Sequence, residues 1–159
     1  MGVTVRPAGR ADLRAAAGLV RGQPLFAPYG LTPAGLERAL AGALGRGEEV
    51  HVADSDGRLS GLVWFQLRGA FGRSGYLRLL VTDGAAQGQG IGSRLLGHAE
   101  ELVFRQADDM FLLVNSENSG ARRFYERHGW RVAGRLDAYV APGLDEVLLR
   151  RTNPDKRRS

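Results

Sequence analysis

The spacing of apolar residues changes along the chain, and each change predicts a different kind of element. Residues 3–8 alternate between apolar and polar side chains, which predicts a short strand. Residues 11–22 and 31–47 then carry apolar residues at helical spacing. In the second of these segments, Thr32 is a suitable N-cap and Pro33 suits the first helical position. The chain is therefore predicted to open as a strand followed by two helices.

The remaining pattern is dominated by strands. Residues 50–53 and 59–68 flank Asp56-Gly57, a dipeptide typical of a tight hairpin turn. Further strands are predicted at 74–83, 110–116, 130–136 and 145–151, with helices at 91–103 and 119–129 between them. The order β-α-α-β-β-β-α-β-α-β-β shows no linker or internal repeat. It predicts one α/β domain over residues 1–152, followed by a short basic tail at 153–159 that we expect to be disordered.

Composition excludes several classes of function. The 159 residues include no cysteine, which rules out disulfides, thiolate metal sites and thiol nucleophiles. No apolar run approaches the ~20 residues that span a bilayer, and the N-terminus has no apolar signal segment. We therefore expect a cytoplasmic protein with no membrane partner.

The net charge of +5 comes almost entirely from arginine, because Lys156 is the only lysine. Frequent Ala, Gly and Arg would follow from genome composition alone. An anionic ligand is the functional alternative, since guanidinium groups match phosphate oxygens. The tail has too few basic residues to predict nucleic-acid binding.

A glycine-rich corner, "QGQGIGS" at residues 87–93, lies where a predicted strand leads into a predicted helix. The first amides of a helix have no partner within it, and the helix dipole adds positive charge there. Gly88, Gly90 and Gly92 would let a phosphate or pyrophosphate approach these amides without obstruction by a Cβ. The alternative is that they only turn the chain. The spacing matches neither the Walker A loop nor the dinucleotide-binding fingerprint.

A second motif follows the corner, in "VNSENSGARRFYERHGWRVAG" at residues 114–134. The pattern Q-x-x-G-x-G followed by N-x-x-A-x-x-F-Y-E-R-x-G-W resembles the GNAT superfamily of acyl-CoA-dependent N-acyltransferases. The detailed match covers about residues 77–134, whereas the first 50 residues agree only in their strand–helix–helix layout. The resemblance implies a mixed, mostly antiparallel sheet of about seven strands flanked by four helices.

The resemblance also implies acetyl-CoA as cosubstrate, with no metal. The glycine corner would hold its pyrophosphate, and the pantetheine arm would pair with the backbone of the preceding strand. The cofactor-binding residues implied are Leu79, Leu80, Val81, Gln87, Gly88, Gln89, Gly90, Ile91, Gly92, Ser93 and Asn118. One of Arg94, Arg122 and Arg123 could reach a CoA phosphate, although each alone reads as an ordinary surface arginine.

Tyr125 would then lie near the thioester and donate a proton to the departing CoA thiolate. Its alternative is a core ring with its hydroxyl at the edge. Asn118 would bind the pantetheine arm or cap the next helix, for which Ser119 is another candidate cap. Without cysteine, acetyl transfer must be direct, with no acyl-thioenzyme.

The general base is not identified by the sequence. Many relatives carry a glutamate on the strand before the glycine corner, but here "GYLRLLV" has none. A water chain or a carboxylate from elsewhere would serve. The candidates are Glu117, Asp137, Asp145 and Glu146, of which we read Asp145 and Glu146 as solvated strand-edge residues. We read the scattered His51, His98 and His128 as structural or surface residues.

The acceptor is expected to be a small-molecule or peptide amine. Phe26, Tyr29 and Tyr139 could wall its pocket, with Asp137 or Asp145 attracting a cation. A homodimer is compatible with the resemblance. The alternative function is a non-catalytic module that binds or senses CoA, suggested by the missing strand glutamate.

Overall fold

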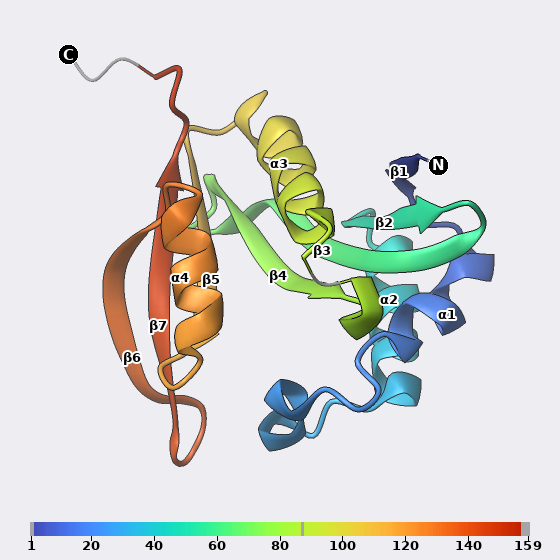
Figure 1. The fold of residues 1–159 in the computed structure, drawn as a ribbon. Helices are drawn as coiled ribbons and strands as arrows, with labels where there is room; N and C mark the ends of the chain where they lie inside the picture. Colours follow the sequence, from blue (N-terminus) through green and yellow to red (C-terminus); the bar gives the residue numbers. More distant parts are fainter. Residues whose placement is uncertain (1, 87, 157–159) are drawn as a thin grey trace.

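The computed structural model describes residues 2–86 and 88–156. Within them, seven strands form one sheet in the order β1-β2-β3-β4-β5-β7-β6 (Figure 1). The strands are β1 (Val3–Pro7), β2 (Glu49–Ser55), β3 (Arg58–Ala70), β4 (Ser74–Thr82), β5 (Asp109–Asn115), β6 (Arg131–Ala141) and β7 (Leu144–Thr152). All neighbours pair antiparallel except β4 and β5. The predicted mixed, mostly antiparallel sheet is confirmed.

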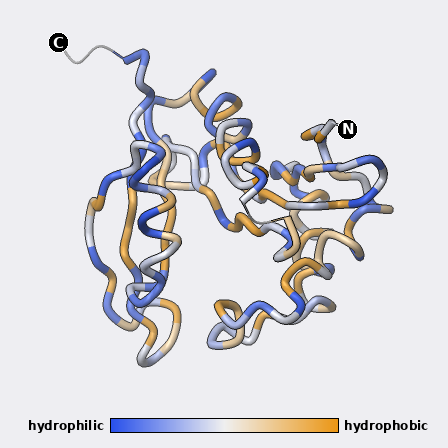
Figure 2. The backbone as a smooth tube through the Cα atoms, in the orientation of Figure 1, coloured by the Kyte–Doolittle hydropathy of each residue, from blue (hydrophilic) through white to orange (hydrophobic). Residues whose placement is uncertain are grey.

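Helices cover both faces of the sheet and enclose two cores. The α-helices are α1 (Leu13–Gly18), α2 (Pro33–Gly45), α3 (Ile91–Phe104) and α4 (Ser119–Arg127), and short 3₁₀ segments are η1 (Arg10–Asp12), η2 (Pro24–Tyr29) and η3 (Gly84–Ala86). One core packs α3 and α4 against the sheet, and the other packs α1 and α2 against its opposite face. Figure 2 shows apolar stretches running through the inner strands, whereas the outermost strand β6 mixes apolar and polar residues and is mostly exposed.

Local signals in the sequence explain most element boundaries. Thr32 caps α2, its Oγ1 accepting a hydrogen bond from the Gly35 amide at 3.1 Å. The hairpin turn after β2 places Asp56 and Gly57 at φ 54° and 88°, which suits a tight turn with two positive φ angles. Asn118, rather than Ser119, caps α4, because its Oδ1 accepts from the Ala121 amide at 3.0 Å.

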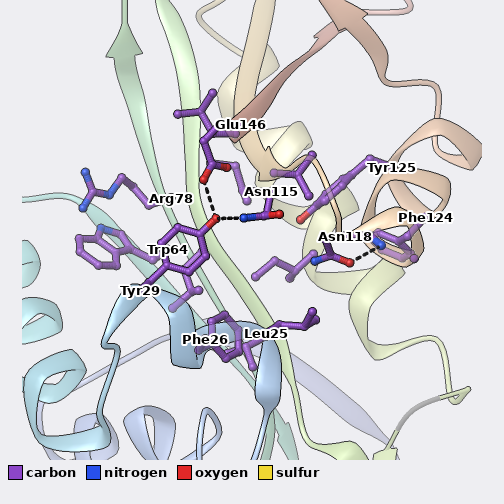
Figure 3. Close-up of a pocket in the computed structure, with 18 of the residues that line it drawn as sticks. Leu25, Phe26, Tyr29, Trp64, Arg78, Asn115, Asn118, Phe124, Tyr125 and Glu146 are labelled. Carbon is purple, nitrogen blue, oxygen red and sulfur yellow. Dashed lines mark hydrogen bonds between the residues drawn. The ribbon is translucent and has the colours of Figure 1, made fainter. Parts of the chain in front are cut away.

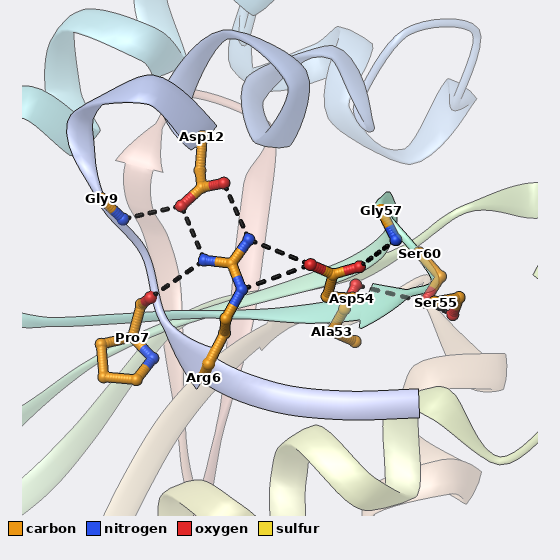
Figure 4. A network of polar contacts seen from close by, with 9 residues as sticks. All are labelled: Arg6, Pro7, Gly9, Asp12, Ala53, Asp54, Ser55, Gly57 and Ser60. Carbon is orange, nitrogen blue, oxygen red and sulfur yellow. Dashed lines mark hydrogen bonds and ion pairs between the residues drawn. The ribbon is translucent and has the colours of Figure 1, made fainter. Parts of the chain in front are cut away.

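The predicted helix over 11–22 is shorter in the structure, where α1 ends at Gly18. Its start is fastened to the sheet by Arg6 of β1, which donates to both carboxylate oxygens of Asp12 at 2.9 and 3.0 Å (Figure 4). Arg6 also donates to Asp54 of β2 at 3.1 Å, so one guanidinium links two strands and the first helical segment (Figure 4).

Strands β4 and β5 separate after a short parallel contact, and this separation creates the site described below. They pair only at Gly75–Met110, Tyr76–Phe111 and Leu77–Leu112. A bulge interrupts β4 at the same point, since Phe65 faces Leu77 but Trp64 faces Leu79. The extra residue bends the strand away from its neighbour. Figure 1 shows the two strands together near one end and diverging toward the other.

No helix in the described ranges combines the length and apolarity needed to cross a membrane.

Candidate active site

The space between the diverging strands is an open cavity of about 1810 Å³. Its lining comes from η2, from β4, from the start of α3, from the ends of β5 and α4, and from the β6–β7 hairpin. Gly90, Asn118 and Tyr125 all line it. The fold therefore brings the two sequence motifs to one cavity, although they lie on different helices. Figure 3 shows Asn118 and Tyr125 of the second motif beside it.

The glycine corner presents backbone amides to this cavity. Gly88 and Gly90 have φ angles of 83° and 76°, the left-handed region that other residues rarely adopt. Gly90 is the N-cap of α3, so the amides of the first helical turn, Ile91 to Ser93, have no partner within the helix. No other acceptor among the described residues takes a hydrogen bond from them. Of the predicted corner residues, Gln87 lies outside the described residues, and Gln89 is exposed.

Gly92 marks the close approach of two helices. A Cβ added there would meet Phe124 Cζ of α4 at 3.4 Å and Thr82 Cγ2 of β4 at 3.8 Å. Gly92 also lines the cavity. A larger side chain would therefore extend into the space between α3, α4 and β4.

Residues Leu79, Leu80 and Val81 occupy the separated part of β4. They pair with Trp64, Val63 and Leu62 of β3, and no residue of β5 pairs with them. Val81 is buried, and Leu79 and Leu80 pack against the two cores. The side chains thus serve the cores, and the strand edge facing β5 has unpaired backbone groups.

Tyr125 lies at the junction of core and cavity. Its side chain is 8% exposed, and its ring packs edge-on against Phe124 and Trp130, with centroids 5.2 and 5.7 Å away. Burial raises the pKa of the Tyr125 phenol above its ordinary value near 10. The phenol is therefore protonated at neutral pH and can act as a proton donor. Both roles considered for this residue, core packing and a hydroxyl at the cavity, are compatible with its position (Figure 3).

Glu146 was misread from the sequence as a solvated strand-edge residue. It is 2% exposed and lines the cavity. Tyr29 of η2 donates its phenolic hydrogen to Glu146 Oε1 at 2.5 Å, and Asn115 of β5 donates from Nδ2 to the same phenol oxygen at 3.0 Å (Figure 3). Burial, followed by the hydrogen bond to Glu146, raises the pKa of Tyr29. The cluster links three segments far apart in sequence.

The other candidate carboxylates are less suited to a role in the cavity. Asp145 accepts from the Ala138 amide at 2.8 Å and from Arg135 at 2.9 Å, and so holds the β6–β7 hairpin. Asp137 pairs with Arg135 at 2.7 Å, and its side chain is 75% exposed. Glu117 lines the cavity but is exposed. Glu146 is thus the buried carboxylate among the four candidates.

Arg78 is the extra residue of the β4 bulge, between Leu77 and Leu79, and has no partner in the β3 ladder. Its guanidinium lies 4.8 Å from the centroid of the Trp64 ring. Of the arginines considered for phosphate binding, Arg94 and Arg123 are exposed. Arg122 has a buried Nε without a hydrogen-bond partner among the described residues and pairs with Glu126 at 3.9 Å.

The three aromatic residues predicted to line the acceptor pocket differ in how far they are buried. Phe26 and Tyr29 are partly buried in η2 and line the cavity. Tyr139 also lines it but is 65% exposed on the hairpin.

The three histidines, read from the sequence as structural or surface residues, make contacts between elements that are distant in sequence. His51 Nδ1 and His98 Nε2 share a hydrogen bond at 2.9 Å, and His51 Nε2 bonds Glu49 at 2.7 Å. Burial, and then the neighbouring His51, lowers the pKa of His98. His128 Nε2 bonds Ser93 Oγ at 2.9 Å, joining α4 to the first turn of α3. Across the described part of the chain, no three His, Asp or Glu side chains form a group that could hold a metal ion.

Solved structures share this fold. A GNAT-family protein from Desulfovibrio desulfuricans superposes with a TM-score of 0.83 and 20% identity, covering 95% of this chain and 99% of that one. The protein yncA of Salmonella typhimurium, solved with its cofactor acetyl-CoA, gives a TM-score of 0.74 and 17% identity, covering 99% and 98%. At 20% and 17% sequence identity, the structural similarity establishes the fold alone.

Sequence comparison shows the family. An uncharacterized N-acetyltransferase of Methanocaldococcus jannaschii is 31% identical over 109 residues, which are 67% of this chain and 68% of that protein. A mycothiol acetyltransferase of Brachybacterium faecium is 33% identical over 108 residues, and the match spans 66% of this chain but only 33% of that longer protein. The model of the acetyltransferase (GNAT) family matches residues 22–130. This chain belongs to the GNAT family of acetyltransferases.

Proposed function

We propose that this protein is an N-acetyltransferase that moves an acetyl group from acetyl-CoA to a primary amine by direct transfer. Acetyl-CoA is the cosubstrate of GNAT acetyltransferases, and one structural neighbour was solved with it. The observation that carries the proposal is one cavity lined by the first turn of α3, by the unpaired edge of β4 and by Tyr125.

In this proposal, backbone groups hold the cosubstrate. The amides from Gln87 to Ser93 bind its pyrophosphate, helped by the positive end of the α3 dipole. The backbone of residues 79–81 pairs with the pantetheine arm, using the groups that β5 leaves unpaired. Asn118 adds its Nδ2 donor, because Oδ1 already caps α4.

Tyr125 is the proposed general acid. When the amine nitrogen bonds to the acetyl carbon, the carbon–sulfur bond breaks and the sulfur needs a proton. The raised pKa of the phenol keeps that proton available at neutral pH. A well-placed acid contributes about 10²–10⁴-fold to the rate.

The test is CoA thiol release from acetyl-CoA over a panel of benzylamine, tyramine, lysine, spermidine and a short peptide with a free N-terminus. We expect turnover with at least one amine. Tyr125→Phe should lower kcat about 10²-fold while leaving acetyl-CoA affinity within a factor of about two. Tight acetyl-CoA binding by the wild type without turnover on any amine would favour the sensor module and overturn the proposal.

A further inference from the structure

Glu146 is a buried carboxylate without a positive partner. At 2% exposure it has lost nearly all contact with water. None of the ion pairs among the described residues involves it. Burying a lone charge is costly unless a cation or several hydrogen bonds compensate it. In the described part of the chain its carboxylate accepts one hydrogen bond, from Tyr29.

The sheet register determines where this carboxylate faces. Glu146 is directly opposite Asn115 in the β5–β7 ladder, so the two side chains lie on the same face of the sheet. The adjacent pair, Val114 and Val147, lies on the other face, buried in the core beneath α3 and α4. Glu146 therefore faces away from those helices, toward η2 and the cavity (Figure 3).

A primary amine at neutral pH carries a charge opposite to that of a carboxylate. Alkylammonium groups have a pKa near 10, so at neutral pH the acceptor is a cation and must lose a proton before it can attack. Strand β4 offers no carboxylate, because its residues include Arg78 and no Asp or Glu. The cavity thus contains one buried carboxylate that forms no ion pair with any described residue, and an ammonium group would complement it.

We propose that Glu146 binds the ammonium group of the acceptor and acts as its general base, with Tyr29 as a positioning residue. This inference rests on the proposed acetyltransferase function. The Tyr29 hydroxyl occupies Oε1, which leaves Oε2 for the substrate. Asn115 fixes the phenol from the other side, so the carboxylate is held by groups from η2 and β5.

The proton balance is complete with these groups. Glu146 takes one proton from the ammonium ion and passes it to water. The nitrogen then bonds to the acetyl carbon, and the carbon–sulfur bond breaks. Tyr125 protonates the sulfur and recovers a proton from the acetylated nitrogen. The products are an amide, the CoA thiol and one proton.

The titratable groups that line the cavity with Glu146 include the phenols of Tyr29 and Tyr76, the guanidinium of Arg78, and the carboxylates of Asp145 and Glu117. Tyr29 keeps its proton, since its pKa is raised. Burial also raises the pKa of Tyr76 on β4, and the charges of Tyr139 and Glu146 add to that rise whereas Arg78 opposes it. A pH profile near neutrality therefore reports mainly on the acceptor and its base.

The test compares wild type with Glu146→Gln, using the amine of the panel that turns over fastest, at saturating acetyl-CoA. Glutamine has the same shape and can still accept from Tyr29. We expect kcat/KM to fall about 10²-fold at pH near 7, with acetyl-CoA affinity unchanged. The variant should need pre-formed free amine, so the deficit should shrink about tenfold per pH unit toward the pKa of the amine.

Asp137→Asn is the matched control, because Asp137 is an exposed hairpin carboxylate, and its profile should follow wild type. A deficit in Glu146→Gln that stays constant with pH, or no deficit, would overturn the assignment. If that variant does not fold, Tyr29→Phe replaces it. Removing the donor should move the acidic limb of kcat/KM to higher pH, and an unmoved limb would contradict the proposal. Failure of wild type to turn over any amine would instead remove the proposed function and this inference with it.

Discussion

Replacing Gly92 by alanine should raise the stability of the protein while weakening acetyl-CoA binding. Gly92 is the second residue of α3, and alanine in a helix interior is favoured over glycine by about 1 kcal/mol. The added Cβ would lie 3.4 Å from Phe124 Cζ, an ordinary contact that needs little movement. Near the helix end part of the gain is lost, so we expect the free energy of unfolding to rise by roughly 0.5 kcal/mol.

The same methyl group would reduce the space between α3, α4 and β4. In the proposed complex, the pyrophosphate approaches the unpaired main-chain amides of the first turn of α3 here, and the pantetheine arm runs along β4 beside them. We expect the Kd for acetyl-CoA to rise about tenfold, which corresponds to about 1.4 kcal/mol of binding free energy. Isothermal titration calorimetry measures the Kd, and urea unfolding measures the stability of the same samples.

Gly97→Ala provides the control. Gly97 lies in the same helix, is exposed, and has no atom within 4 Å of an added Cβ. It should gain up to about 1 kcal/mol of stability with unchanged acetyl-CoA affinity. Equal Kd values for wild type, Gly92→Ala and Gly97→Ala, all folded, would refute the reasoning that the bare amides at Gly92 receive the cosubstrate.

Two further predictions concern the helix cap and acid stability. Asn118→Ala should destabilise the protein by about 1 kcal/mol in urea unfolding, because the cap of α4 is lost. Asn118→Ser keeps a capping oxygen but lacks the Nδ2 donor, so it should restore stability but not acetyl-CoA affinity. Full recovery of affinity in the serine variant would argue against that donor. The hydrogen bond from Arg6 lowers the pKa of Asp12 in the folded protein. The ionised Asp12 therefore contributes its full stabilisation above the pKa of an unfolded aspartate, near 3.9. That stabilisation is lost as the pH falls through the lower pKa of the folded state. Unfolding midpoints should therefore fall less steeply with acid in Asp12→Asn than in wild type, and parallel curves would contradict this.

Features encoded in short segments could be predicted from the sequence. The strand–corner–helix transition follows from the change in apolar spacing and from glycines that must adopt positive φ, as Gly88 and Gly90 do. Burial of Tyr125 follows from its place in a short amphipathic helix before Trp130. The cap of α4 was ambiguous because Asn118 and Ser119 are both good capping residues, and only the backbone geometry distinguishes them.

Features that depend on long-range pairing could not be predicted. The face to which Glu146 points is set by its register opposite Asn115, and its partner Tyr29 comes from a segment 117 residues away. The contact between His51 and His98 likewise needs α3 to pack over β2. A strand pattern fixes the alternation of faces, but not which face meets a core and which meets a cavity.

A crystal structure of the protein soaked with acetyl-CoA tests the central claim most directly. The account predicts the diphosphate within hydrogen-bond distance of main-chain amides between residues 87 and 93, the pantetheine arm between β4 and β5, and the thioester beside Tyr125. Acetyl-CoA bound elsewhere, or side chains filling the space between the two strands while the amides stay uncontacted, would contradict it.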